Sequence, residues 1–119
     1  MDSIVQYLIY SLKEEEIYKN NRILHKESYI LRLITLAYLT NKTLRVSDLL
    51  ANKDLGSGLT IQTYITQLVL KQFVIRKVSE EDKRVQLLIP TDNAINLFRE
   101  LSKVMYDERI IRPSQDSLQ

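Results

Sequence analysis

Glycine and proline, the residues that most often interrupt regular structure, occur only four times in this chain of 119 residues. Both glycines, Gly56 and Gly58, lie in one short stretch, and the two prolines are Pro90 and Pro113. These four residues divide the chain into a few long segments. A chain of this length buries roughly two-thirds of its unfolded surface, which is enough for one hydrophobic core. We therefore expect a single domain over residues 1–111.

Apolar residues recur at helical spacing in most of these segments. The pattern predicts amphipathic helices over residues 2–19 and about 30–38, and a short helical segment at 46–52. A further helix begins near Thr60, after the glycine turn, with one apolar side and one polar, uncharged side. The apolar side comprises Ile61, Ile65 and Leu68, and the polar side comprises Gln62, Thr63, Thr66 and Gln67.

Two short segments rich in β-branched, aromatic or other apolar residues follow, at residues 73–78 and 85–89. The charged segment between them predicts a β-hairpin with a charged tip. Pro90 cannot extend the ladder, so we expect the second strand to stop before it. Thr91 is a suitable N-cap for a last helix that reaches about Met105. Residues 112–119 are polar and are predicted to form a disordered tail.

The order of these segments is helix, helix, short helix, turn, helix, hairpin, helix, which is the order of a winged helix-turn-helix. We expect a mainly α fold with a small β-hairpin, flanked by N- and C-terminal dimerisation helices. Such a fold presents one helix to the major groove of DNA and its hairpin, the wing, to the minor groove or backbone. The same unit also serves as a protein-protein interaction module. The architecture favours DNA binding but leaves both functions open.

The segment from Glu81 to Asp92 resembles the wing of the MarR family of bacterial transcription regulators. In that family an Asp-x-Arg at the wing tip precedes an apolar strand, and a threonine opens the next helix. Asp82, Arg84 and Thr91 occupy these positions here. The resemblance implies a sequence-specific regulator of transcription that binds double-stranded DNA. We expect it to act as a homodimer and as a repressor, although the sequence does not distinguish a repressor from an activator.

The resemblance extends beyond the wing. Residues 46–50 and 57–61 are similar to the first helix of the family's helix-turn-helix and to the start of its recognition helix. The match covers about residues 44–101, with the DNA-binding lobe at about 44–90. Three positions depart from the family pattern: Thr63 stands where an arginine is common, Gln72 replaces a glycine, and the loop at 52–56 is one residue longer.

The predicted DNA-binding residues lie on the recognition helix and on the wing. Gln and Thr side chains on the helix suit base edges, the start of the helix suits a phosphate, and wing cations suit the minor groove. The resemblance implies that Asp82 orients Arg84, and Arg45 is a further phosphate candidate. The alternative is a solvated helix face and a charged turn of little energetic value. The predicted contacts are Ser57, Thr60, Gln62, Thr63, Thr66, Gln67, Arg76, Lys77, Lys83 and Arg84.

The two terminal helices carry apolar stripes, Ile4 to Leu12 and Leu97 to Met105, that a winged-helix core does not need. Burial against a second copy explains them, so we expect a homodimer and a pseudo-palindromic DNA site. The resemblance also implies a small aromatic effector, in a pocket lined by Tyr29 and Tyr38. The alternative, which we favour for the tyrosines, is packing in the core and at a subunit interface.

Composition excludes several other functions. With no cysteine and one histidine, the chain lacks thiolate chemistry and a multi-histidine metal site, and it has no glycine-rich phosphate loop. We expect no enzyme activity, no cofactor, no metal and no membrane segment, and a cytoplasmic location. The net charge is only +2, and all of this excess lies between Arg45 and Pro90. A binder of this charge depends on a few well-placed contacts rather than on a strongly basic surface.

Overall fold

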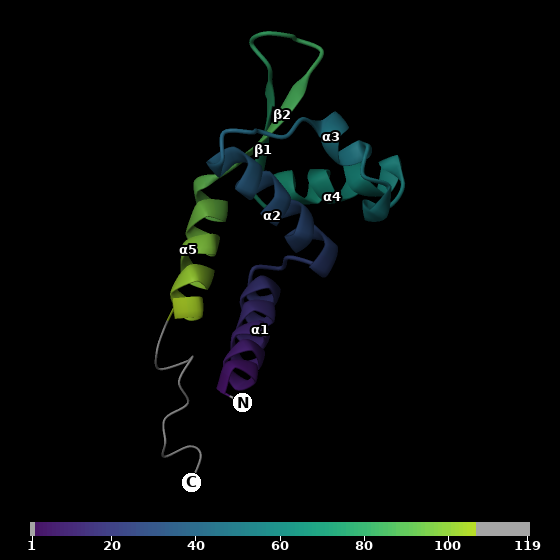
Figure 1. Cartoon of the computed structure of the whole chain (residues 1–119). Coiled ribbons are helices and arrows are strands. Elements are labelled where there is room, and N and C mark those ends of the chain that lie inside the picture. Colours follow the sequence, from purple (N-terminus) through teal and green to yellow (C-terminus); the bar gives the residue numbers. More distant parts are fainter. Residues whose placement is uncertain (1, 107–119) are drawn as a thin grey trace. The chain divides into compact units, whose positions relative to one another are not determined.

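The structure is a computed structural model that describes residues 2–106 (Figure 1). The predicted tail at 112–119 and the end of the predicted domain at 1–111 lie outside these residues. The described residues form two compact units, Leu24–Ile95 and the segments before and after it. The elements are α1 (Asp2–Asn20), α2 (His25–Leu39), α3 (Val46–Leu50), the 3-10 helix η1 (Lys53–Leu55), α4 (Gly58–Leu70), β1 (Val74–Val78), β2 (Gln86–Pro90) and α5 (Asp92–Tyr106).

The central unit, Leu24–Ile95, has its core where α2, α4 and the hairpin meet. Helix α4 contacts α2, α3 and β1, and α2 also contacts β2. The apolar side predicted for the recognition helix is the buried side, because Ile61, Ile65 and Leu68 have no exposed surface. Ile34 of α2 and Leu88 of β2 are equally buried. The predicted fold, mainly helical with a two-stranded antiparallel hairpin, is confirmed.

The hairpin pairs β1 with β2 from Val74–Pro90 to Val78–Gln86. The prediction that the ladder stops before Pro90 was therefore wrong by one residue. Proline lacks an N–H, but it can end a strand where no further donor is required of it. A single bridge between Arg45 and Leu87 adds a third, one-residue strand beside β2, which the sequence pattern did not reveal.

Three helices end in the same left-handed turn without a glycine. Arg22, Asn41 and Gln72 follow α1, α2 and α4 with φ near +60° to +67°. After α4, the Gln72 N–H donates to Val69 O at 3.0 Å and the Phe73 N–H to Leu68 O at 2.9 Å, which is the Schellman pattern. The backbone at Gln72 favours a residue without Cβ, which fits the glycine that the resembled pattern has at this position.

The turn before α4 is built from local hydrogen bonds. Asn52 Oδ1 accepts from the Asp54 N–H at 3.2 Å as η1 begins, and Gly56 follows with φ +120°, where a side chain is disfavoured. Ser57 then caps α4, its Oγ accepting from the Thr60 N–H at 3.2 Å. The helix consequently begins at Gly58, two residues before the predicted start.

The apolar stripes of α1 and α5 differ in exposure. On α1, Ile4, Leu8 and Leu12 are 54–67% exposed. On α5, Leu97 and Leu101 are each only 4% exposed within the single chain. The inference that both stripes require a second copy was therefore wrong for this part of α5, which is already covered. The exposed stripe of α1 stays without a cover in the chain itself.

Candidate nucleic-acid interface

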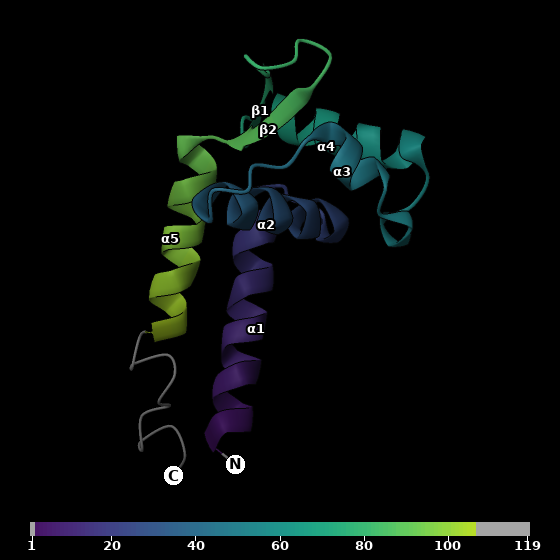
Figure 2. The same ribbon diagram turned by 45° about the horizontal axis from the view of Figure 1, so that its top comes forward.

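The outward face of α4 carries the polar side chains predicted from its periodicity. Thr63, Thr66 and Gln67 are exposed, and Gln62 is half-buried. Because α4 contacts the core through its opposite side, none of these side chains is needed for packing of the central unit. Helix α4 also contacts β1, so the hairpin lies beside the recognition helix (Figure 2).

The start of α4 combines a cap with an exposed apolar side chain. Ser57 Oγ lies 2.9 Å from Thr60 Oγ1 and also accepts from the Thr60 N–H. These two hydroxyls thus form an ordinary N-cap of the helix. Both residues also remain accessible to a phosphate. Leu59 between them is 80% exposed, the highest value among the large apolar side chains of the described residues. Sequence reasoning missed Leu59, although an apolar residue on the polar side was the available signal.

The two threonines of the outward face have fixed hydroxyl roles. Thr63 Oγ1 donates to Leu59 O, one turn earlier, at 2.9 Å. Thr66 Oγ1 instead accepts from Arg76 Nη2 at 3.0 Å. Arg76 comes from β1, so this bond holds a wing cation against the recognition helix. The sequence placed both residues in the site but gave no signal that they meet.

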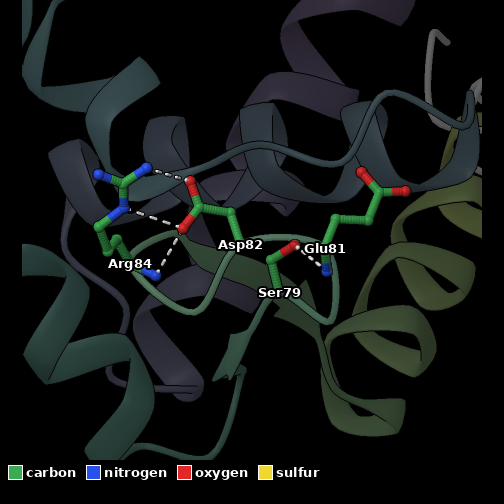
Figure 3. Close-up of polar contacts among 4 residues, drawn as sticks. All are labelled: Ser79, Glu81, Asp82 and Arg84. Atoms are coloured by element: carbon green, nitrogen blue, oxygen red, sulfur yellow. Dashed lines mark hydrogen bonds and ion pairs between the residues drawn. The ribbon is translucent and has the colours of Figure 1, made fainter.

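At the wing tip, Asp82 and Arg84 form a bidentate pair (Figure 3). Arg84 Nε lies 3.1 Å from Asp82 Oδ1, Nη2 lies 3.2 Å from Oδ2, and the Arg84 N–H also donates to Oδ1 at 3.0 Å. The Arg84 side chain, followed by its backbone N–H, holds the pKa of Asp82 below its usual value. The carboxylate therefore stays ionised, and it orients a guanidinium that is 90% exposed.

A hollow of about 610 Å³ at the wing has a lining of mixed charge. It is lined by Glu80, Glu81 and Asp82 together with Lys77 and Arg45. Neither Lys83 nor Arg84 belongs to this lining, and both are exposed. These two cations are therefore accessible outside the hollow, where Arg84 is bonded to Asp82.

Arg45 is bound to its own helix. Its Nη2 lies 3.0 Å from Asp48 Oδ1, and the Arg45 N–H donates to Asp48 Oδ2 at 2.8 Å. The Arg45 side chain is the main cause that lowers the pKa of Asp48. Arg45 thus stabilises the first turn of α3. If Arg45 also binds a phosphate, its guanidinium has to contact the phosphate and Asp48 at the same time.

No profile of a known protein family matches the sequence, and neither does any curated protein. Solved structures do match. The S. aureus MepR–DNA complex has a TM-score of 0.68 at 18% identity, covering 91% of this chain and 80% of that one. The transcriptional regulator Tm0710 from Thermotoga maritima has a TM-score of 0.71 at 13% identity, covering 95% and 74%.

The chain has the winged-helix fold of MarR-type regulators. This fold assigns α3 and α4 to the helix-turn-helix and β1–β2 with their connecting loop to the wing. The predicted contact residues on the outward face of α4, with Arg76 and Arg84, thus lie on the helix-turn-helix and on the wing, and their contact with DNA stays a prediction.

The two tyrosines of the predicted effector pocket do not share the hollow that Tyr29 lines. This hollow of about 230 Å³ is lined by Tyr29 with His25, Lys26, Ile30, Asp54 and Leu55, and Tyr38 is not part of its lining. Nine residues of helix separate the two tyrosines by about 13 Å. NadR in complex with 4-hydroxyphenylacetate is a further winged-helix match, with a TM-score of 0.61 at 23% identity, covering 92% of this chain and 77% of that one.

The favoured alternative for the tyrosines was packing in the core and at a subunit interface. Tyr18 is in the core, at 7% exposed. Tyr7, Tyr29 and Tyr38 are 41–61% exposed in the single chain and do not belong to its core, so for them packing at an interface stays a prediction. The face of the Tyr29 ring is instead approached by Arg32, whose guanidinium carbon lies 5.8 Å from the ring centre.

Two further kinds of feature are absent from residues 2–106. No three His, Asp or Glu side chains in this part of the chain gather closely enough to hold a metal ion. No helix in the same range combines the length and the apolar character that crossing a bilayer demands.

Proposed function

We propose that this protein is a MarR-type transcriptional regulator that binds double-stranded DNA with α4 in the major groove and the wing at the minor groove or backbone. The observation that carries the proposal is the bond between Arg76 and Thr66. It joins a wing cation to the outward face of the recognition helix, so helix and wing present one continuous surface. A solvated helix face has no need of such a link.

We propose further that the active form is a homodimer that represses by occupying a promoter. Helix α1 supports this form, because Ile4, Leu8 and Leu12 expose more than half of their surface in the single chain. An apolar face of this kind is covered in a stable protein. A two-fold dimer places two recognition helices about 34–36 Å apart and therefore requires a pseudo-palindromic site.

The DNA-binding proposal is tested by titrating fluorescent duplex fragments of the protein's own promoter region at several salt concentrations. Each phosphate that the protein neutralises contributes about 0.9 to the slope of log affinity against log salt. We expect a slope that corresponds to several contacts. Absence of binding at low salt, with a stoichiometric protein partner recovered instead, would favour the interaction-module alternative and reject the proposal.

Single variants separate the roles of the wing and the helix. Arg84→Ala should weaken binding to all sequences by a similar factor and reduce the salt slope by about one. Gln67→Ala should change the preferred sequence with little effect on the slope. Arg99→Ala is the matched control, because Arg99 is an exposed arginine of α5 outside the interface. The reverse pattern for Arg84 and Gln67 would refute these assignments.

The dimer is tested by sedimentation of the protein at several concentrations. Leu8→Glu places a charge in the exposed stripe of α1 and should convert the dimer to a monomer. Gln6→Glu introduces the same charge on another side of α1 and should leave the dimer intact. A Leu8→Glu variant that sediments like the unmodified protein contradicts the assignment of α1 to the interface.

We propose that the hollow at Tyr29 receives the small aromatic effector. Lys26 beside the ring suits an aromatic acid, and Asp54 in the lining disfavours a second carboxylate. Adding 4-hydroxyphenylacetate should raise the melting temperature of the protein and lower its DNA affinity, and Lys26→Glu should abolish both effects. An unchanged response in Lys26→Glu would place the effector elsewhere.

A further inference from the structure

We infer that the recognition helix selects half-sites whose central base pairs are A·T, an inference that rests on the proposed DNA binding and specifies its target. It concerns the recognition surface, defined as the outward side chains of α4. Helical spacing of four, three and four residues aligns Leu59, Thr63, Thr66 and Leu70 along this surface, with Gln62 and Gln67 on its two sides.

The composition of the recognition surface leaves out the charged side chains that most often read G·C pairs. The commonest contact to guanine is a bidentate Arg or Lys on O6 and N7, and cytosine N4 is read by Asp or Glu. None of the six side chains is charged. Glutamine bonds adenine at N6 and N7, and the thymine methyl group takes apolar contacts.

The two ends of α4 carry exposed leucines, and the one in the first turn points to the thymine methyl in particular. Leu59 is 80% and Leu70 is 68% exposed, although the core side of α4 is complete without them. Leu59 lies in the first turn, and the N-terminal part of a recognition helix is the part that reaches base edges. Burying such an exposed apolar side chain stabilises a complex most when the DNA offers a methyl group in the major groove. Among the four bases, only thymine has one.

At Thr63, the methyl group gives the argument for an A·T pair. The hydroxyl proton of Thr63 is donated to Leu59 O, so the side chain offers only an acceptor and a methyl group to DNA. The acceptor fits the adenine N6 and the cytosine N4 amino groups equally, whereas the methyl group fits the thymine methyl. Thr66, in contrast, accepts from Arg76 and keeps its proton for a base acceptor. A guanine is therefore expected only beside Thr66, where the Arg76 guanidinium lies.

The wing supplies an independent argument for A·T pairs. Arg84 is held in an extended fork by Asp82 and is 90% exposed, so its guanidinium is available to a groove. A·T tracts have a narrow minor groove with an enhanced negative potential that attracts arginine. A·T pairs are thus favoured both beneath the wing and opposite the first turns of α4. The wing selects them by electrostatic potential, and the helix selects them by contacts to base edges.

The test is selection of bound duplexes from a random library by the full-length protein. We expect A·T pairs at the positions that face Leu59 and Thr63, and guanine at no more than one position per half-site. A consensus with G·C pairs at those positions overturns the inference and leaves the DNA-binding proposal intact. Failure to select any DNA overturns both, so the two outcomes are distinguishable.

A methyl-deletion experiment tests the role of Leu59 directly. Replacing thymine by deoxyuridine in the selected duplex removes the C5 methyl group and keeps every hydrogen-bonding atom. We expect several-fold weaker binding by the unmodified protein and no change for Leu59→Ala, because that variant has already lost the contact. An equal response of both proteins refutes the contact. Since the readout is a difference between two duplexes, general damage from the substitution cancels.

A gain-of-specificity variant completes the test. Thr63→Arg introduces the side chain that reads guanine, and it should move one selected position from A·T to G·C. Affinity for the original site should fall by roughly 10-fold or more, as for loss of one good base contact. The control variant, Arg99→Ala, should select the original sequence. A Thr63→Arg protein with an unchanged consensus shows that Thr63 does not face a base and overturns that part of the inference.

Discussion

A buried ion pair ties the end of the recognition helix to the start of α2, and it supports a quantitative prediction. Glu27 Oε1 accepts from Lys71 Nζ at 2.7 Å and from the Leu24 N–H at 2.9 Å. The Glu27 side chain is 1% exposed, whereas that of Lys71 is 24% exposed. The other carboxylate oxygen, Oε2, is buried and has no hydrogen-bond partner in the described residues. The carboxylate therefore depends on Lys71 for its counter-charge.

The perturbation is Lys71→Met, which keeps the length of the side chain and removes the ammonium. Breaking a fully buried pair costs about 3–5 kcal/mol, because one charge stays buried alone. Lys71 is partly hydrated, so the lost attraction is smaller, and we expect about 2–3 kcal/mol less stability. Glu27→Gln should cost less, about 1–2 kcal/mol, since the amide oxygen still accepts from Leu24 and the remaining ammonium reaches water.

The assay is urea denaturation followed by circular dichroism at one fixed protein concentration, because dimerisation makes stability depend on concentration. The double variant Glu27→Gln with Lys71→Met should be more stable than Lys71→Met alone by about 1 kcal/mol, since no charge is then left buried. If Lys71→Met is as stable as the unmodified protein, or if the double variant loses the sum of both effects, the two groups are not coupled and the reasoning fails.

Three further predictions concern the helix-turn-helix. Gln72→Gly should raise the free energy of unfolding by about 0.5–1 kcal/mol. The left-handed conformation costs a residue with Cβ about 1–2 kcal/mol, and its relief exceeds the entropic cost of glycine. A lower stability of this variant in urea would contradict a strained turn. Ser57→Asp should keep the cap and the melting temperature but weaken DNA binding by charge repulsion, whereas Ser57→Ala should cost about 1 kcal/mol of stability. Asp48 has a pKa below its ordinary 3.8, so its pairing with Arg45 stabilises the fold above that pH and the benefit disappears as the pH falls through the lowered pKa. Asp48→Asn should therefore show a flatter loss of stability below about pH 4 than the unmodified protein, and parallel acid titrations would contradict this role.

The elements of the fold were predictable because each has a local cause in the sequence. The buried side of α4 follows from the spacing of Ile61, Ile65 and Leu68, and the hairpin follows from two apolar runs around a charged tip. The pairing of Asp82 with Arg84, which the family resemblance implied, is also local, since the two residues are only two positions apart in a tight turn. Such features depend on neighbours in the chain, which a sequence displays directly.

The features that escaped prediction depend on distant parts of the chain. Glu27 and Lys71 are 44 positions apart, and only the contact between α2 and α4 brings them together. The bond from Arg76 to Thr66 likewise requires the hairpin to lie beside α4. The left-handed turn at Gln72 was hidden for another reason, because a glutamine gives no sign of a backbone that glycine would suit better.

Gln72 also has a mechanical consequence. Its carbonyl accepts from Thr91 Oγ1 at 2.6 Å and from Asn93 Nδ2 at 3.3 Å, while the neighbouring Lys71 bonds Glu27. The end of α4 is thus clamped to the first turns of two other helices, whereas the proposed DNA contacts begin at its other end. Helix α4 has 13 residues, which makes it a lever of about 20 Å. A rotation of about 6° at the clamp moves Leu59 by about 2 Å, more than a hydrogen bond tolerates. In the proposed complex, small displacements of either neighbouring helix would thereby be amplified at the bases.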